Sequence, residues 1–338
     1  MSNHITQAYP KSAAIRGADD WAPTASLEHL KARAALLAAV RAFFAARGVW
    51  EVDTPVLSAA TTPDCHIDSF ETLYHGPGAG AGRRLYLQTS PEYAMKRLLA
   101  AGSGPIYQLG KVFRNGESGQ WHNPEFTMLE WYRPGFSYVA LMDEVEALVR
   151  SVLPIPAADR ITYRMAFLRH AGIDPSLATT AQLAEQCAPF GIQGGADVDD
   201  RDFWLDVLMS HRVAPALRGG PPVFIHEFPA SQAMLARLLP DDPSVAERFE
   251  FYIDGVEIAN GYGELGSGRE THERLMTEQR RRKRHGGAAI AVDARLIAAL
   301  QESFPDCAGV ALGVDRLLML AVNASAIDEV VAFPIERA

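Results

Sequence analysis

Two glutamates flank a predicted hairpin turn in the C-terminal half of the chain. Asp254-Gly255 is a strong two-residue turn signal, and its register places Glu250 diagonal to Glu257 on one face, with backbones roughly 7–8 Å apart. Two carboxylates so placed on a buried sheet repel each other unless the face is hydrated or holds a divalent cation. Mg²⁺ bound with nucleotide phosphates fits this arrangement, because Mg²⁺ takes one or two carboxylates plus phosphate oxygens. A hydrated acidic face is the alternative.

The strand after this turn continues with polar residues. The turn pairs Tyr252 with Glu257, and strict alternation then puts Asn260, Tyr262 and Glu264 on the face opposite the two glutamates. They join the carboxylate face only if the strand bulges between Glu257 and Asn260. The sequence leaves both arrangements open.

Two predicted strands joined by a polar loop form a second hairpin, of which the later strand is 126–132. On this strand Phe126, Met128, Glu130 and Tyr132 share one side, because side chains alternate along a strand. A carboxylate and a phenol beside a Phe suit a pocket that takes an ammonium group at one end and a flat ring at the other. An edge strand with a solvated Glu is the alternative.

Two weaker signals mark the starts of helices. Residues 309–315 run from a strand into a helix with small residues at the junction, and Arg316 in the first turn can reach a phosphate or stack on a base. Packing is the more common reason for such a junction. Ser90-Pro91-Glu92 reads as a complete helix start, with Ser as N-cap and Pro at the first position, and requires no function.

The elements that must position these residues predict an α+β fold. A helix begins at Leu27 and can end at Gly48, and the stretch 154–222 reads as a mostly helical insertion. Successive strands are mostly not separated by a single crossover helix, which favours an antiparallel sheet flanked by helices. We therefore expect one domain over 27–338 after a loose polar arm, 1–26. The predicted strands are 85–89, 106–113, 126–132, 223–228, 248–253, 256–265 and 308–312, and further helices are expected at 293–303 and 315–322.

Composition excludes several classes of protein. The 338-residue chain is 48% hydrophobic but has no run of about eighteen apolar residues, so no transmembrane helix is expected. The first twenty residues include Lys11, Arg16, Asp19 and Asp20 and no apolar core segment, so no secretory signal is expected either. Cys65, Cys187 and Cys307 are scattered without CxxC spacing, which argues against a disulfide framework and a zinc site and suits the cytoplasm. The net charge of −9 gives no general attraction to nucleic acid.

Taken together and in this order, these segments resemble the class II aminoacyl-tRNA synthetases. Residues 41–57 with Pro55 look like motif 1, residues 113–132 like motif 2, and residues 309–316 like motif 3. Within the class, the lysyl-tRNA synthetases are most similar, through Thr89-Ser90-Pro91-Glu92, residues 122–132 and residues 257–264. The resemblance implies an antiparallel sheet flanked by helices and a homodimer with Pro55 in its interface.

One difference points to a particular branch of this class. Lysyl-tRNA synthetases carry an anticodon-binding barrel before the catalytic domain, and 26 residues cannot make a stable five-stranded barrel. The chain therefore resembles the family of elongation factor P–(R)-β-lysine ligases, especially at 122–134 and 309–318. That resemblance implies ATP, Mg²⁺ and (R)-β-lysine as ligands, with α-lysine used less well, and elongation factor P as acceptor, not tRNA. A truncated synthetase that charges tRNA and an inactive regulatory paralogue are the alternatives.

Carried over position by position, the resemblance implies a role for each site residue. The catalytic residues would be Arg114 and Arg316, which neutralise charge at the phosphates. The nucleotide-binding residues would be Arg114, Asn115, Gly116, His122, Asn123, Phe126, Glu257, Ile258, Gly313 and Arg316. The Mg²⁺ ligands would be Glu250 and Glu257. The substrate-binding residues would be Ser90, Pro91, Glu92, Glu130, Tyr132, Asn260, Glu264 and Ala311, with Glu130, Tyr132 and Glu264 at the terminal ammonium group and Asn260 at the carboxylate.

Three features lie outside this pattern or test it. Motif 2 carries Arg-x-Glu, but Gly116 stands at the Glu position, with Glu117 next, so adenine recognition there would fall to Glu117 or to backbone. Ala311 is glycine in lysyl-tRNA synthetases, and its methyl group would select β-lysine over α-lysine by about 1–3 kcal/mol. The basic run 280–284 is expected to be a solvated helix face, with a docking patch for an acidic protein as the alternative.

Overall fold

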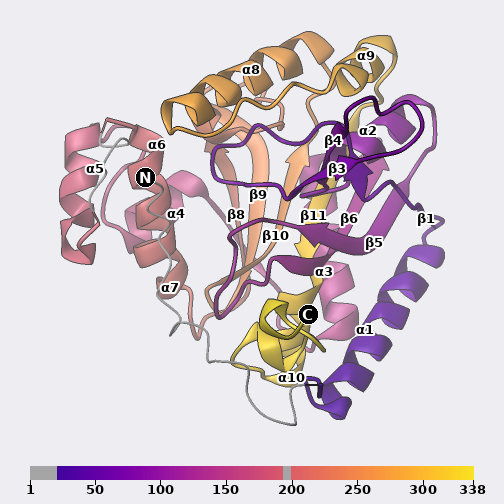
Figure 1. The fold of residues 1–338 in the computed structure, drawn as a ribbon. Coiled ribbons are helices and arrows are strands. Elements are labelled where there is room, and N and C mark those ends of the chain that lie inside the picture. Colours follow the sequence, from indigo (N-terminus) through magenta and orange to yellow (C-terminus); the bar gives the residue numbers. More distant parts are fainter. Residues whose placement is uncertain (1–20, 193–198) are drawn as a thin grey trace. The chain divides into compact units, whose positions relative to one another are not determined.

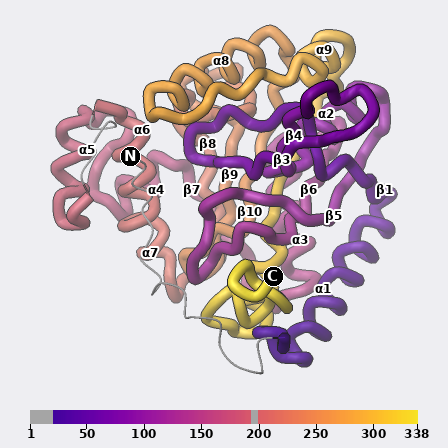
Figure 2. The backbone as a smooth tube through the Cα atoms, in the orientation of Figure 1, coloured from indigo at the N-terminus to yellow at the C-terminus, as the bar shows by residue number. Residues whose placement is uncertain are grey.

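The computed structural model describes residues 21–192 and 199–338 (Figures 1 and 2). Most of the predicted arm, 1–26, lies outside the described residues. The chain separates into two compact units. Unit 1 contains the chain up to Tyr132, Ser267–Pro305 and Leu312–Ala338, and unit 2 contains Arg133–Gly266 and Asp306–Ala311. No helix in the described part of the chain has both the length and the apolar content that crossing a bilayer requires.

The first sheet of unit 1 carries the long hairpin that the sequence predicts. β5 (Ile106–Phe113) has the predicted bounds, and β6 (Glu125–Pro134) extends the predicted strand by a residue or two at each end. The two strands pair antiparallel, and β1 (Trp50–Glu51) adds to β5 in parallel.

Helix α1 (Leu27–Ala45) packs its apolar face on this hairpin. Ser26 caps the helix by accepting a hydrogen bond from His29 N–H, as an N-cap serine does. Near the other end, the Phe44 ring stacks on Tyr107 with 4.4 Å between centroids and meets Trp131 edge-on at 5.4 Å. Phe44 and Trp131 are fully buried, so these aromatic contacts form the core of unit 1 beside β5 and β6.

A second layer of unit 1 consists of a small sheet and three helices (Figure 1). The strands β2 (Leu57–Ser58), β4 (Arg83–Leu87) and β3 (Glu71–Tyr74) pair antiparallel in the order β2-β4-β3. β4 begins and ends two residues before the predicted strand, 85–89. The helices α2 (Glu92–Ala100), α8 (Gly268–Arg284) and α9 (Ala294–Glu302) pack against one another through α9. The helix at the C-terminal end, α10 (Val314–Val322), packs on α1.

The start of α2 corrects one prediction. Pro91 is the cap residue and makes no side-chain cap hydrogen bond, so Ser90 is not the N-cap. Ser90 Oγ still accepts a hydrogen bond from Glu92 N–H at 3.0 Å. The difference arises because Ser90 lies one residue further from the helix than a capping serine and donates its own proton elsewhere.

Unit 2 contains four neighbouring strands of the larger sheet, in the order β10-β9-β8-β7. β8 (Val223–Pro229), β9 (Val245–Ile253) and β10 (Val256–Gly263) pair antiparallel, whereas β7 (Asp159–Thr162) joins β8 in parallel. Helix α3 (Tyr138–Val152) packs on β9 and β10. The fold is therefore α+β with mainly antiparallel strands beside helices, as predicted. β11 (Cys307–Gly313) crosses the boundary between the units.

The segment between α3 and β8 is built mainly of short helices around its own core. Its buried side chains include Phe167, Leu183, Leu205 and Leu208, and helix α4 packs on β7 and β8. Figure 1 shows α4, α5 and α6 together. The helices are α4 (Tyr163–His170), α5 (Thr180–Cys187), α6 (Arg201–Leu208) and α7 (Ala214–Ala216), with a 3₁₀ turn at Ala188–Phe190 and a π-turn at Met209–Val213. Further 3₁₀ turns are found at Ala230–Gln232, Ile327–Glu329 and Ile335–Arg337.

Candidate active site

Some of the predicted site residues belong to unit 1 and the others belong to unit 2. In unit 1, the loop between β5 and β6 begins with Arg114, whose N–H donates to Pro124 O at 2.9 Å and so continues the hairpin past the last strand pair. The Arg114 guanidinium lies 5.1 Å from the centre of the Phe126 ring and 3.7 Å from a Glu117 oxygen. Its Nε is buried and has no hydrogen-bond partner among residues 21–192 and 199–338. A buried donor without an acceptor fits an anionic ligand.

The backbone explains the glycine that departs from the family pattern. Gly116 has φ +82°, in the left-handed region that glycine adopts readily and other residues adopt with strain. A Cβ at this position would meet no atom within 4 Å, so the restriction comes from the backbone and not from space. The carboxylate beside Arg114 belongs to Glu117, one residue later.

His122 lies at the other end of the loop and contacts Arg316 from α10. The Arg316 Nη2 to His122 Nε2 distance is 2.6 Å. A guanidinium can only donate, so this ring nitrogen accepts and the imidazole is neutral. Loss of solvation, followed by the positive charges of Arg316 and Arg114, lowers the pKa of His122 to about 4. His122 is nevertheless an exposed residue, so solvent screens these charges and weakens their effect.

Asn123 anchors the same loop. Its Oδ1 accepts from Ile335 N–H at 3.0 Å, and its Nδ2 donates to Glu125 O at 2.6 Å. The side chain is buried, with 5% exposure. Both of its polar atoms therefore have protein partners, and a nucleotide contact would have to share them.

Glu130 is the buried carboxylate that the strand pattern singled out. It is 3% exposed, and its two oxygens accept from Ser90 Oγ at 2.6 Å and from Tyr132 O–H at 2.7 Å. These contacts exclude the alternative of an edge strand with a solvated Glu. Two hydroxyl donors hold this buried carboxylate in a fixed orientation, and an ionised carboxylate so placed forms strong hydrogen bonds with an ammonium group.

Glu92 has a partner that the sequence did not suggest. Lys96, one helical turn later, is only 1% exposed and its Nζ lies 2.7 Å from Glu92 Oε1. Spacing of four residues on a helix could have indicated this pair. An amine contact at Glu92 would therefore form beside an existing ion pair.

In unit 2, the strand β10 contains the bulge on which the sequence argument depended. Val256 pairs with Ile253 and Glu257 with Tyr252, as predicted, but Ala259 then pairs with Phe251. The extra residue is Ile258. At this point β10 therefore has one residue more than β9. The side chains of β10 that follow the bulge face the opposite side from the one that strict alternation gives.

The bulge brings the polar residues of β10 to the carboxylate face. Asn260 pairs with Glu250 and Tyr262 with Arg248, so these four side chains and Glu257 share one side of the β9–β10 hairpin. The hairpin turn itself is as predicted, with positive φ angles at both Asp254 and Gly255. Strict alternation is therefore wrong for this strand, and the bulged arrangement is confirmed.

Glu250 is held by its neighbours on this face. Arg248 Nη2 donates to one oxygen at 2.7 Å and Tyr252 O–H donates to the other at 2.5 Å. Burial raises the pKa of Tyr252 well above its usual value, with the Glu250 charge adding to this, so the phenol stays protonated and donates. Arg248 was not predicted, although its spacing of two residues from Glu250 places it on the same face.

The remaining predicted residues, Glu264 and Ala311 of unit 2 and Gly313 of unit 1, lie at or near the ends of β10 and β11. Glu264 is 4% exposed, and its N–H donates to Cys307 O at 2.9 Å. On β11, Ala311 and Gly313 are the only positions of the strand that are not fully buried. Their alternation puts them on one side, as expected for residues that line a ligand.

Comparison with known proteins identifies the family. The model of the tRNA synthetases class II (D, K and N) matches residues 20–337. The chain belongs to the class II tRNA synthetases. It is 51% identical over 319 residues to the elongation factor P–(R)-β-lysine ligases of Yersinia pestis strain Pestoides F and Yersinia pseudotuberculosis serotype O:1b. Each match covers 94% of this chain and 98% of the relative. Membership of this ligase family implies use of ATP.

Motifs 2 and 3 of this class II synthetase are joined by residues that the sequence analysis did not name. Asp315, 2% exposed, accepts from Thr127 N–H at 2.6 Å and from the Arg33 guanidinium at 2.5 Å. Arg33 also donates to Thr127 Oγ1 at 2.5 Å. The network fixes the start of α10, and with it Arg316, against β6 and α1. The apolar spacing that predicts α1 does not indicate that Arg33 makes these contacts.

The side chains on the β9–β10 face carry the type of ligand atom that a magnesium ion binds. Glu250, Glu257 and Asn260 supply oxygen atoms, and the buried Oδ1 of Asn260 has no hydrogen-bond partner in the described part of the chain. Oxygen ligands are those that Mg²⁺ prefers. Because both oxygens of Glu250 already accept hydrogen bonds, an ion there would share them with Arg248 and Tyr252.

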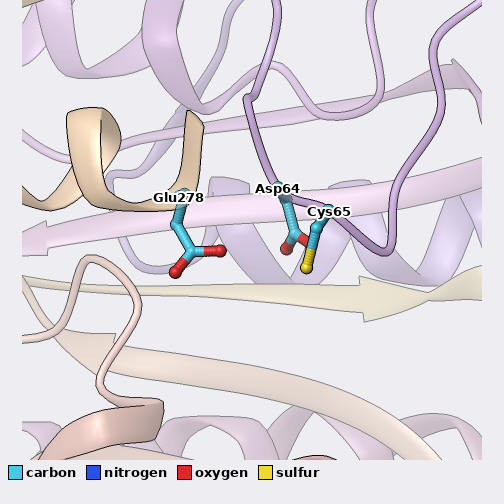
Figure 3. A group of neighbouring side chains, drawn as sticks. All are labelled: Asp64, Cys65 and Glu278. Atoms are coloured by element: carbon cyan, nitrogen blue, oxygen red, sulfur yellow. The ribbon is translucent and has the colours of Figure 1, made fainter. Parts of the chain in front are cut away.

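A separate group of possible metal ligands occurs in unit 1, away from these residues in sequence. Figure 3 shows Asp64 and Cys65 on a loop and Glu278 on α8. The possible ligand atoms of these three residues all lie within 4.8 Å of one another. Burial, helped by the Asp64 charge, raises the pKa of the Cys65 thiol to about 12. Metal binding needs the thiolate, so this setting disfavours it, and we assign no metal site there.

Proposed function

We propose that this protein uses ATP to activate (R)-β-lysine as an aminoacyl-adenylate and transfers the β-lysyl group to a lysine side chain of elongation factor P. The observation that carries the proposal is the 51% identity to ligases of that name over nearly the full length of both chains. The buried Glu130, oriented by two hydroxyl groups, supports it as a receptor for an ammonium group. We further propose action in the cytoplasm, as the three scattered cysteines suggest.

The first step requires no general base. The substrate carboxylate is ionised at neutral pH, since its reference pKa is about 3.5. One carboxylate oxygen forms a bond to the α-phosphorus of ATP, and the bond from that phosphorus to the bridging oxygen of pyrophosphate breaks. Arg114 and Arg316 stabilise the charge that develops on the phosphate oxygens. Mg²⁺ held by Glu250 and Glu257 would neutralise charge on the departing phosphates.

The second step forms an amide. The amine of the acceptor lysine attacks the acyl carbon, a C–N bond forms, the C–O bond to AMP breaks, and the amine loses a proton. That amine has a reference pKa of about 10.4, so a proton acceptor is needed. His122 is neutral, but its Nε2 accepts from Arg316, so this nitrogen is not the base. The phosphate of the adenylate is a chemically reasonable acceptor.

We also propose that the protein is a homodimer through its motif 1 segment. Trp50 and Leu57 are 52% and 45% exposed, and Val56 between them is 40% exposed. These exposed apolar side chains lie close together in sequence, on the short strands β1 and β2 and the bend before β2, and they suit contact with the same segment of a second copy about a twofold axis.

The experiment that tests adenylation is ATP–pyrophosphate exchange with purified protein, Mg²⁺ and (R)-β-lysine. Exchange should proceed without tRNA and should be lost in Arg114→Ala. Dependence of the exchange on added tRNA would instead favour a tRNA-charging enzyme, and no exchange under any condition would favour an inactive paralogue.

A further inference from the structure

The basic run at the end of α8 contains one arginine that is buried. Arg282 is 8% exposed, whereas Arg280, Lys283 and Arg284 are exposed. The expectation of a solvated helix face is therefore wrong for Arg282. Both a solvated face and a docking patch stay open for the three exposed residues, which with Thr277 line a shallow hollow on the surface.

The Arg282 guanidinium donates hydrogen bonds to the loop that precedes β3. Its Nη1 donates to Asp64 O at 2.8 Å and to Ile67 O at 3.1 Å, and its Nη2 pairs with the Asp68 carboxylate. Its Nε donates to Ala288 O at 3.3 Å. The loop runs alongside α8 in Figure 2. One side chain thus satisfies three carbonyls and a carboxylate, which requires the planar set of donors that arginine alone provides.

The same loop is hydrogen-bonded to motif 2. Asp68 O accepts from Asn115 N–H at 2.7 Å, and the two residues form an isolated antiparallel bridge. Asn115 directly follows Arg114. Because Arg282 fixes both the backbone at Ile67 and the side chain of Asp68, it determines where this bridge can form and hence the direction in which the chain leaves Arg114.

We infer that Arg282 is a positioning residue for adenylation, acting through Asp68 and Asn115 on Arg114. The inference rests on the proposed role of Arg114 at the phosphates. Gly287 leaves the space that the Arg282 side chain occupies, since a Cβ at that position would lie 2.6 Å from Arg282 Cγ. A misplacement of about 1 Å in a group that contacts the reacting atoms can lower a rate by about 100-fold.

The test compares Arg282→Met with Arg284→Met, which removes the same charge from an exposed position of the same helix. In pyrophosphate exchange, Arg282→Met should lower kcat by about 10- to 100-fold and change KM for the amino acid by less than about threefold, because Glu130 accepts hydrogen bonds from Ser90 and Tyr132, which lie outside this loop. Arg282→Lys should recover only part of kcat, because an ammonium group cannot reach all four acceptors. Arg284→Met should behave as the wild type.

Hydrogen exchange gives a readout that does not depend on turnover. The Asn115 amide, protected by Asp68 O, should exchange at least about tenfold faster in Arg282→Met than in Arg284→Met. If Arg282→Met does not fold, Asp68→Asn serves instead, since the Asp68 side chain is 44% exposed. It should show the same two effects, though weaker ones.

Two outcomes would overturn the inference. One is a kcat for Arg282→Met equal to that of Arg284→Met. The other is an unchanged exchange rate at Asn115 in both Arg282→Met and Asp68→Asn. Failure of the proposed function is distinguishable, because then the wild type itself would show no pyrophosphate exchange while the amide measurement would still report on the contact.

Discussion

Replacing Glu130 with Gln should separate binding of the amino acid from binding of ATP. The substitution keeps the size of the side chain and removes one negative charge from a site with 3% exposure. Ser90 and Tyr132 can rotate their hydroxyl groups to suit an amide, so we expect the free energy of unfolding to fall by only about 1 kcal/mol. The fold should therefore survive, and the effect should lie in ligand binding.

The magnitude follows from the burial of the carboxylate. Truncating one partner of a buried charged hydrogen-bonded pair costs about 2–5 kcal/mol. At about 1.4 kcal/mol per factor of ten, this corresponds to a rise in KM for the amino acid of about 30-fold or more. KM for ATP should change by less than about threefold, because the carboxylate is assigned to the ammonium end of the amino acid.

Glu125→Gln is the matched control on the same strand. Glu125 pairs with Lys111 at 3.2 Å, but the two side chains are 49% and 43% exposed. Such a surface pair is worth about 0–1 kcal/mol, so this variant should resemble the wild type. Both KM values are measured by pyrophosphate exchange, with thermal unfolding to check folding. An equal rise in both KM values, or equal behaviour of the two variants, would refute the assignment of Glu130.

Three further predictions concern other parts of the molecule. Ala311→Gly should improve kcat/KM for α-lysine relative to (R)-β-lysine by about ten- to two-hundredfold, and an unchanged ratio in pyrophosphate exchange would place selectivity elsewhere. The wild type should scatter light as a dimer at micromolar concentration and Leu57→Glu should shift it toward monomer, whereas a monomeric wild type would contradict the proposed interface. His122 should show no titration between pH 5 and 8 by NMR, with the signal assigned from His122→Gln; a midpoint near 6.5 would contradict its lowered pKa. Since that pKa is below the unfolded value, the stability that neutral His122 contributes should be present above about pH 6.5 and decline as the pH falls toward 4.

Patterns that depend on neighbours in sequence were predicted well. β5 has the predicted bounds, and the Asp254-Gly255 turn sets the predicted pairing of Tyr252 with Glu257. Both follow from local rules, namely alternation along a strand and the positive φ angles that a two-residue turn requires. The class II motifs were recognised for the same reason, because each is a continuous run of residues.

Features that depend on distant partners were not predicted. The bulge at Ile258 follows from how β10 pairs with β9. The sequence alone indicated only which face the later polar residues would occupy if such a bulge formed. The burial of Arg282 depends on carbonyl groups more than 200 residues earlier in the chain, so a run of basic residues on one helix could not reveal it. The Arg33–Asp315–Thr127 network is likewise made of three separate segments. Periodicity carries no information about such contacts.

The most direct test of the proposed function is the mass of elongation factor P after incubation with this protein, ATP, Mg²⁺ and (R)-β-lysine. The proposal predicts a gain of one β-lysyl group on a lysine residue of the factor, without tRNA, and no gain with Arg114→Ala. Tandem mass spectrometry would locate the modified lysine. An unmodified factor, together with attachment of the amino acid to tRNA in the same mixture, would contradict the proposal.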